Sequence, residues 1–125
     1  ENCFAVTYGK SHHYAKTFCE LGFGLNLASH EVYLSVAGGM KISEPAGDLA
    51  VAAAVISAAK NLPLPAGSIF FGEVGLSGEV RKVAQSDSRI KEAAKLGFTS
   101  MYCSSKEKKQ GIEPIFHLKQ LASIF

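Results

Sequence analysis

The most apolar stretch of the chain runs from Leu49 to Ala59 and contains one polar residue. Pro45 suits the first turn of a helix and Asn61 suits the end of one, so this pattern predicts a helix over residues 46–60. A helix half exposed to water carries a polar stripe, and this segment has none. We therefore expect the helix to lie buried at the centre of the domain, or to face another subunit in part.

Shorter apolar runs, separated by glycine, proline and polar turns, predict the remaining elements. We expect further helices over residues 11–21, 88–96 and 117–124, and strands over residues 32–36, 40–42, 68–74, 79–83, 99–103 and 112–116. A turn around Leu76-Ser77-Gly78 joins two of these strands into a hairpin, and Gly97 closes the helix that follows. Helices and strands alternate, so the predicted fold class is α/β, with a mixed sheet because of the hairpin.

The composition is that of one soluble globular domain: 125 residues, of which 47% are apolar and 19% charged. The chain begins at Glu1, so we expect it to be part of a longer gene product. No apolar run approaches the roughly twenty residues that span a bilayer. Cys3, Cys19 and Cys103 are odd in number and lack zinc or redox spacing, which favours reduced thiols in a cytoplasmic protein.

Two Gly-Glu pairs, Gly72-Glu73 and Gly78-Glu79, bracket the hairpin turn. With the segments 36–50 and 88–98, this hairpin resembles the Lon-type proteolytic domain. The resemblance is greatest to its non-proteolytic version, which lies at the C-terminal end of proteins of the bacterial RadA (Sms) recombination family. It covers roughly residues 21–120 and implies a Lon-type fold over 21–125. Residues 1–20 form a more divergent segment that leads into the first helix of the same domain.

The resemblance also implies that this domain is not a peptidase. Lon-type proteases use a Ser-Lys dyad, whose two positions fall here on Ala46 and Arg89. Alanine has no nucleophile, and arginine stays protonated and cannot accept a serine proton. Ser43 is the alternative nucleophile, although a serine just before Pro45 is better interpreted as a helix N-cap.

RadA-type proteins couple such a domain to an ATPase motor and form a hexameric ring. The chain contains no Gly-x-x-x-x-Gly-Lys-Ser/Thr phosphate loop and no four-cysteine zinc module. We therefore expect no cofactor in this domain, and we expect ATP, magnesium and zinc to bind in other parts of a parent DNA-dependent ATPase.

Charge is the remaining guide to a binding role. The net charge is +2, and residues 63–125 hold nine basic side chains against six acidic ones. The predicted DNA-binding residues are Lys41, Arg81, Lys82, Arg89 and Lys91. Such a cluster contacts phosphates of single-stranded or duplex DNA without reading sequence. The alternative is that Lys82, Lys91 and Lys95 form an ordinary solvated face, and the charged run 106–109 is typical of a solvated loop.

Three hypotheses follow. The first is a non-catalytic Lon-like scaffold and DNA-binding domain of a RadA-type branch-migration motor, which acts in recombinational repair. The second is a Lon-type peptidase with an unorthodox or degenerate active site. The third is an oligomerisation module whose basic residues have no nucleic-acid role. Glu73 and Glu79 could serve a peptidase as acid or base, but glutamates at strand ends more often make local hydrogen bonds.

Overall fold

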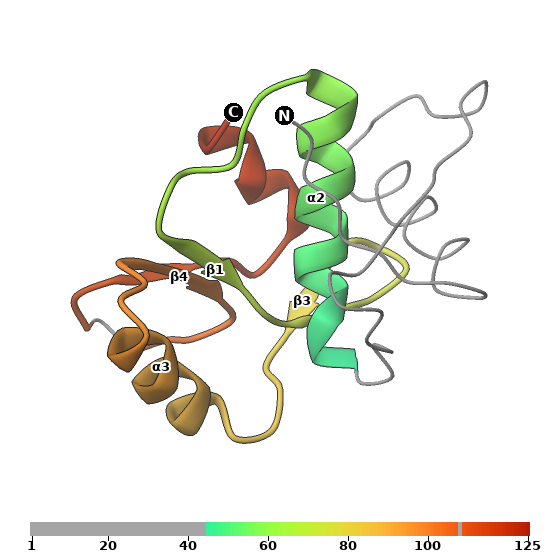
Figure 1. Cartoon of the computed structure of the whole chain (residues 1–125). Coiled ribbons are helices and arrows are strands. Elements are labelled where there is room, and N and C mark those ends of the chain that lie inside the picture. Colours follow the sequence, from blue (N-terminus) through green and yellow to red (C-terminus); the bar gives the residue numbers. More distant parts are fainter. Residues whose placement is uncertain (1–44, 108) are drawn as a thin grey trace, which may run out of the picture.

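The computed structural model of the chain describes residues 45–107 and 109–125, and within them helices and strands alternate as the sequence predicts (Figure 1). Lys41, Ser43 and the elements expected before residue 45 lie outside the described residues. The elements are η3 (Pro45–Gly47), α2 (Asp48–Lys60), β1 (Ser68–Phe70), β2 (Glu73–Val74), β3 (Val80–Arg81), α3 (Ser86–Lys95), β4 (Ser100–Cys103), β5 (Ile112–Pro114) and η4 (Leu118–Ser123). The predicted α/β class is confirmed.

The strands form two sheets. Strands β1, β4 and β5 make a parallel sheet in the order β1-β4-β5, with Phe70 opposite Tyr102 and Tyr102 opposite Glu113. Strands β2 and β3 make a separate antiparallel pair, with Glu73 opposite Arg81. The prediction that the hairpin belongs to one mixed sheet with the other strands is therefore wrong for the described part of the chain.

The predicted continuous strand over 68–74 is also wrong, because the chain changes sheets at Gly72. The N–H of Phe71 still donates to the Tyr102 carbonyl (3.1 Å), but the N–H of Gly72 donates to the Ala46 carbonyl (2.9 Å), and its own carbonyl accepts from the Leu49 N–H (3.0 Å). A Cβ at residue 72 would lie 2.8 Å from Val80 Cγ1. The start of the buried helix thus takes the hydrogen bonds that a longer strand would have used, and the close approach favours glycine.

Helix α2 is central to the main core. Its buried residues are Leu49, Val51, Ala52, Ala53, Ala54, Val55, Ile56 and Ser57. All of them except Ala54 and Ser57 share one core with Phe70 of the parallel sheet and with Leu118 and Leu121 of η4, which runs beside α2 in Figure 1. The helix ends at Asn61, which adopts a left-handed conformation (φ 54°), as the sequence predicts. The structure thus agrees with the prediction of a helix buried at the centre of the domain.

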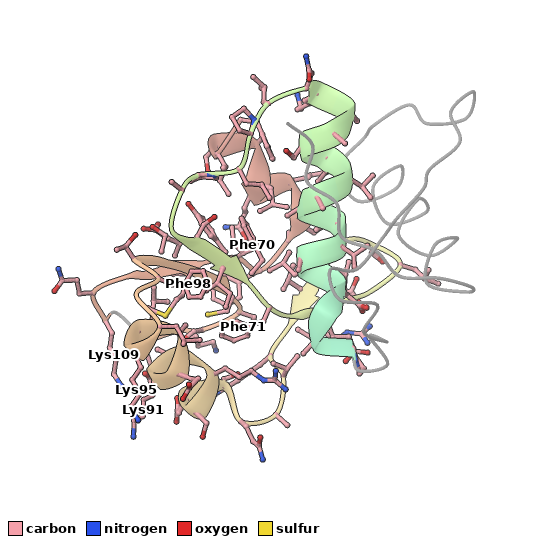
Figure 2. All side chains as sticks on the ribbon, in the orientation of Figure 1. Phe70, Phe71, Lys91, Lys95, Phe98 and Lys109 are labelled. Atoms are coloured by element: carbon pink, nitrogen blue, oxygen red, sulfur yellow. The ribbon has the colours of Figure 1, made fainter. Side chains whose placement is uncertain are left out.

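Helix α3 packs on the other face of the parallel sheet. Phe70 and Phe71 are adjacent and point to opposite faces (Figure 2), so that Phe70 joins the core around α2 while Phe71 packs with Cys103, Ile112 and, from α3, Ile90. Helix α3 begins at Ser86, two residues earlier than predicted. It ends at Lys95, one residue before the predicted end, and Gly97 closes it as predicted. Gly97 has φ +94°, its N–H donates to the Ala94 carbonyl and the next N–H donates to the Ala93 carbonyl.

The C-terminal segment extends the hairpin. The N–H of Val80 donates to the Phe116 carbonyl and the N–H of Leu118 donates to the Gly78 carbonyl, both at 2.8 Å. The predicted helix over 117–124 is a 3-10 helix from 118 to 123, capped by the side chains of His117 and Gln120. Among the described residues, no helix is both long and apolar enough to cross a membrane.

Candidate dyad position and nucleic-acid interface

Ala46, the position that the resemblance gives to a nucleophilic serine, lies in η3 and is 5% exposed. Its carbonyl accepts the Gly72 hydrogen bond described above. Two residues further on, Asp48 Oδ2 accepts a hydrogen bond from the Val74 N–H (3.1 Å). The start of the buried helix is therefore joined to residues 72–74 by three hydrogen bonds, and the side chain at residue 46 is a methyl group without nucleophilic chemistry.

Asp48 is the carboxylate at the start of the buried helix, and its pKa differs strongly from the ordinary value. Burial raises the pKa of Asp48 from 3.8 to about 6; the hydrogen bond from Val74 lowers it and the negative charge of Glu73 raises it further. Sequence reasoning did not single out Asp48. An acidic residue in the first turn of the predicted helix was visible, but its partner in β2 was not.

Arg89, the position that the resemblance gives to the catalytic lysine, is half-buried in the first turn of α3. Its Nε donates to the Ala84 carbonyl (3.1 Å) and its backbone N–H donates to the Gln85 carbonyl (3.0 Å). The guanidinium is permanently charged, so it cannot serve as a general base. These bonds hold Arg89 to the turn that precedes its own helix.

Arg81 lies between two carboxylates of the hairpin. Its Nη2 is 2.5 Å from Glu79 Oε2, and its Nη1 is 3.8 Å from Glu73 Oε2, across the antiparallel pair. Hydrogen bonds from its own backbone and from Arg81 lower the pKa of Glu79, which keeps this carboxylate charged. The three side chains together carry a net charge of −1. These ion pairs agree with the interpretation of both glutamates as structural.

The remaining predicted DNA-binding residues are distributed over two elements. Lys82 is exposed and directly follows β3, whereas Lys91 is exposed on α3. Figure 2 shows Lys91 gathered with Lys95 and Lys109 on one side of α3. The predicted DNA-binding residues included neither Lys95 nor Lys109, which the sequence analysis interpreted as solvated surface. The spacing of four residues between Lys91 and Lys95 was a signal that could have found the first of them. DNA contact by the predicted cluster stays a prediction.

Metal and thiol chemistry find little support in this part of the chain. Among residues 45–107 and 109–125, no three histidine, cysteine, aspartate or glutamate side chains are placed to hold a metal ion. Cys103 is buried in the smaller core, and burial raises its pKa to about 11. Its thiol is therefore protonated near neutral pH, the form that is a poor nucleophile.

Comparison with known proteins defines the family. The chain belongs to the family described as "Subunit ChlI of Mg-chelatase", whose model matches residues 17–107. Over 100 residues, its sequence is 62% identical to the DNA repair protein RadA of Rickettsia bellii. The matched stretch covers 78% of this chain and 22% of that protein. It is 57% identical over 103 residues to the RadA of Rickettsia prowazekii (81% and 23%), and 53% identical over 75 residues to that of Brucella abortus (60% and 16%).

The predicted relationship to RadA proteins is confirmed by these identities. The chain spans less than a quarter of the length of the Rickettsia relatives, so the activities of the whole protein are matters for proposal. The placement in a Lon-like C-terminal domain stays a prediction.

Proposed function

We propose that the chain is a non-proteolytic Lon-like scaffold and DNA-binding domain of a RadA-type, ATP-dependent protein of DNA repair and recombination, active in branch migration. The observation that carries the proposal is the 62% identity to a DNA repair protein RadA over 78% of the chain. ATP, magnesium and zinc would bind in other parts of the parent protein, which we place in the cytoplasm.

The absence of peptidase activity is supported by the chemistry of two positions. Ala46 offers a buried methyl group where a dyad needs a hydroxyl, and Arg89 offers a permanent charge where a dyad needs a base of lowered pKa. A fluorophosphonate probe, which labels activated serines, is expected to leave the chain unlabelled. Stoichiometric labelling that Ser43→Ala abolishes would establish the peptidase instead.

The scaffold role is supported by the core around α2. Eight residues of this helix are buried, and six of them share one core with residues of the parallel sheet, the hairpin and η4. An element packed on several sides in this way makes a rigid unit, suited to a ring in which a motor moves against a fixed frame. We propose a hexamer with heterologous contacts that close by rotation. Sedimentation velocity of the parent protein and of this chain tests whether the ring needs the motor.

DNA binding is supported by the excess of basic over acidic residues in the second half of the chain. A gel shift with one duplex and one single-stranded oligonucleotide of unrelated sequences tests it directly. Weak binding to both, lost at high salt, is the expected result, because contacts with phosphates release counterions.

A pure oligomerisation module is the second candidate function. The observation in its favour is that Arg81, a predicted DNA contact, forms ion pairs with two glutamates. The three side chains therefore carry no net positive charge. Self-association without any retardation of either oligonucleotide would select this candidate.

A further inference from the structure

Three exposed lysines lie on one side of α3. Lys91 and Lys95 come from the helix, Lys109 comes from the segment between β4 and β5, and in the view of Figure 2 the three side chains lie on the same side of α3. We refer to Lys91, Lys95 and Lys109 as the lysine face. In the sequence, β4 separates Lys109 from the two helical lysines, and the chain after this strand returns to the same side of α3.

The part of the lysine face that lies on α3 is electrostatically uncompensated. Lys91 and Lys95 are one helical turn apart, a spacing at which like charges destabilise a helix by about 0.2–0.5 kcal/mol. Within the described ranges neither ammonium forms an ion pair with a carboxylate, whereas Lys109 pairs with Glu107 at 3.1 Å. In the sequence, α3 and the run 106–109 together hold six basic residues against three acidic ones. A polyanion that docks there would relieve this repulsion.

The hairpin has the opposite character. A phosphate that approaches Arg81 meets Glu73 and Glu79 at the same guanidinium and has to displace at least one of them. Repulsion between like charges makes this exchange unfavourable. Of the basic residues that the sequence suggested, Arg81 is therefore a poor phosphate contact, and Lys91 is a good one.

We infer that the lysine face is the surface on which this chain contacts the phosphates of a nucleic-acid strand, and that Arg81 instead holds the hairpin together. The inference rests on the proposed DNA-binding role. Ammonium groups neutralise phosphates irrespective of base. Along α3, Lys91 and Lys95 are separated by an axial rise of about 6 Å. The phosphates of one strand recur at intervals of about 3.4 Å along the duplex axis, so α3 lying along the duplex would set the two lysines about two phosphates apart.

The test compares two double variants of equal charge change. Lys91→Gln with Lys95→Gln removes two members of the lysine face, and Lys60→Gln with Lys119→Gln is the matched control. Lys60 lies in the last turn of α2 as Lys95 lies in the last turn of α3, so both pairs lose the same interaction with a helix dipole. Fluorescence anisotropy of a labelled duplex, titrated at several salt concentrations, gives the log–log salt slope of each variant.

The log–log salt slope of the lysine-face variant is expected to fall by about 0.9 per lost phosphate contact, hence by about 1.8 in total. Its binding to unrelated DNA sequences should weaken equally. The control variant and Arg81→Gln are expected to keep the log–log salt slope of the unsubstituted chain. Reductive methylation of lysines, read by mass spectrometry, provides a second measurement. DNA should protect Lys91 and Lys95 and leave Lys60 and Lys119 reactive.

Failure of the inference and failure of the proposed function give different results. Suppose that the unsubstituted chain binds DNA, that both double variants change the salt slope equally, and that DNA protects no lysine selectively. The lysine face is then not the contact, and the DNA role stands. If the unsubstituted chain binds neither duplex nor single-stranded DNA, both the inference and the proposed DNA-binding function are overturned. Tighter binding of polyglutamate than of DNA at the same salt would assign the lysine face to an acidic protein partner and would also overturn the inference.

Discussion

The carboxylate of Asp48 accepts a hydrogen bond from the backbone N–H of Val74, with 3.1 Å between Oδ2 and the nitrogen and 26 residues of sequence between them. The bond ties the first turn of α2 to the hairpin. It holds the carboxylate in a half-buried place, where burial raises the pKa of Asp48 to about 6. The burial of Asp48 at this contact therefore couples the join between helix and hairpin to pH.

Stability is expected to fall as pH rises from about 4 to about 6. The pKa of Asp48 is 3.8 in an ordinary environment and about 6 in the fold, so the folded chain binds the proton more tightly. Its contribution to the free energy of unfolding is complete below pH 3.8 and is lost as pH passes through 6. The shift corresponds to about 3 kcal/mol, which solvent screening reduces to about 1–2 kcal/mol.

Asp48→Asn keeps an oxygen acceptor for Val74 but removes the charge. We expect it to raise the free energy of unfolding at pH 7.5 by about 1 kcal/mol and to flatten its decline between pH 4 and 6. Urea denaturation across this range measures both effects. Asp87→Asn, an exposed acid in the first turn of α3, is the matched control and should retain the decline. Loss of stability at pH 7.5 with an unchanged pH profile would contradict the assignment to Asp48.

Gly75 provides space for the carboxylate of Glu79. A Cβ at residue 75 would lie 1.9 Å from Glu79 Oε2, so Gly75→Ala must expel this side chain and break its pairing with Arg81. We expect a loss of about 1 kcal/mol, because the displaced side chain is flexible and the ion pair is exposed. A double-mutant cycle by urea denaturation checks the cause. In a Glu79→Ala background, Gly75→Ala should be nearly neutral; an equal loss in both backgrounds would point to the backbone instead.

His117 joins the C-terminal 3-10 helix to the hairpin turn. Its Nδ1 accepts from the Lys119 N–H (3.1 Å), so its Nε2 carries the proton and donates to the Ser77 carbonyl (2.9 Å). His117→Ala removes the cap and is expected to lower the free energy of unfolding by about 1 kcal/mol. His117→Asn retains an N-cap acceptor and should recover most of this loss. Equal destabilisation by the two substitutions, measured by thermal unfolding, would show that the bond to Ser77 dominates.

Cys103 is expected to be chemically inert while the chain is folded. Burial in the smaller core raises the pKa of its thiol to about 11, so little thiolate forms at pH 8. In a Cys3→Ser, Cys19→Ser background, the reaction of Cys103 with a disulfide reagent should be at least about tenfold slower in the native chain than in urea. Rapid reaction under native conditions would mean that the core around Phe71 opens readily.

The elements that the sequence predicted best are those with local signals. Asn61 ends α2 and Gly97 ends α3 because each adopts a left-handed conformation that few other residues tolerate. The burial of α2 also followed from the sequence, since a helix without a polar stripe has no face for water. The alanine at residue 46, the position that the resemblance gives to a serine, and hence the expectation of no acyl chemistry there, needs no coordinates.

The tertiary structure decided everything that depends on partners distant in sequence. The strand breaks at Gly72 because its backbone N–H and carbonyl form hydrogen bonds with Ala46 and Leu49. The sequence around residue 72 gives no sign of these distant partners. The raised pKa of Asp48 likewise depends on burial beside Val74. Arg81 and Lys91 looked equivalent as basic residues near a turn. Only the fold placed two carboxylates around the first and Lys109 on the same side as the second, because charge compensation is a property of distance in space.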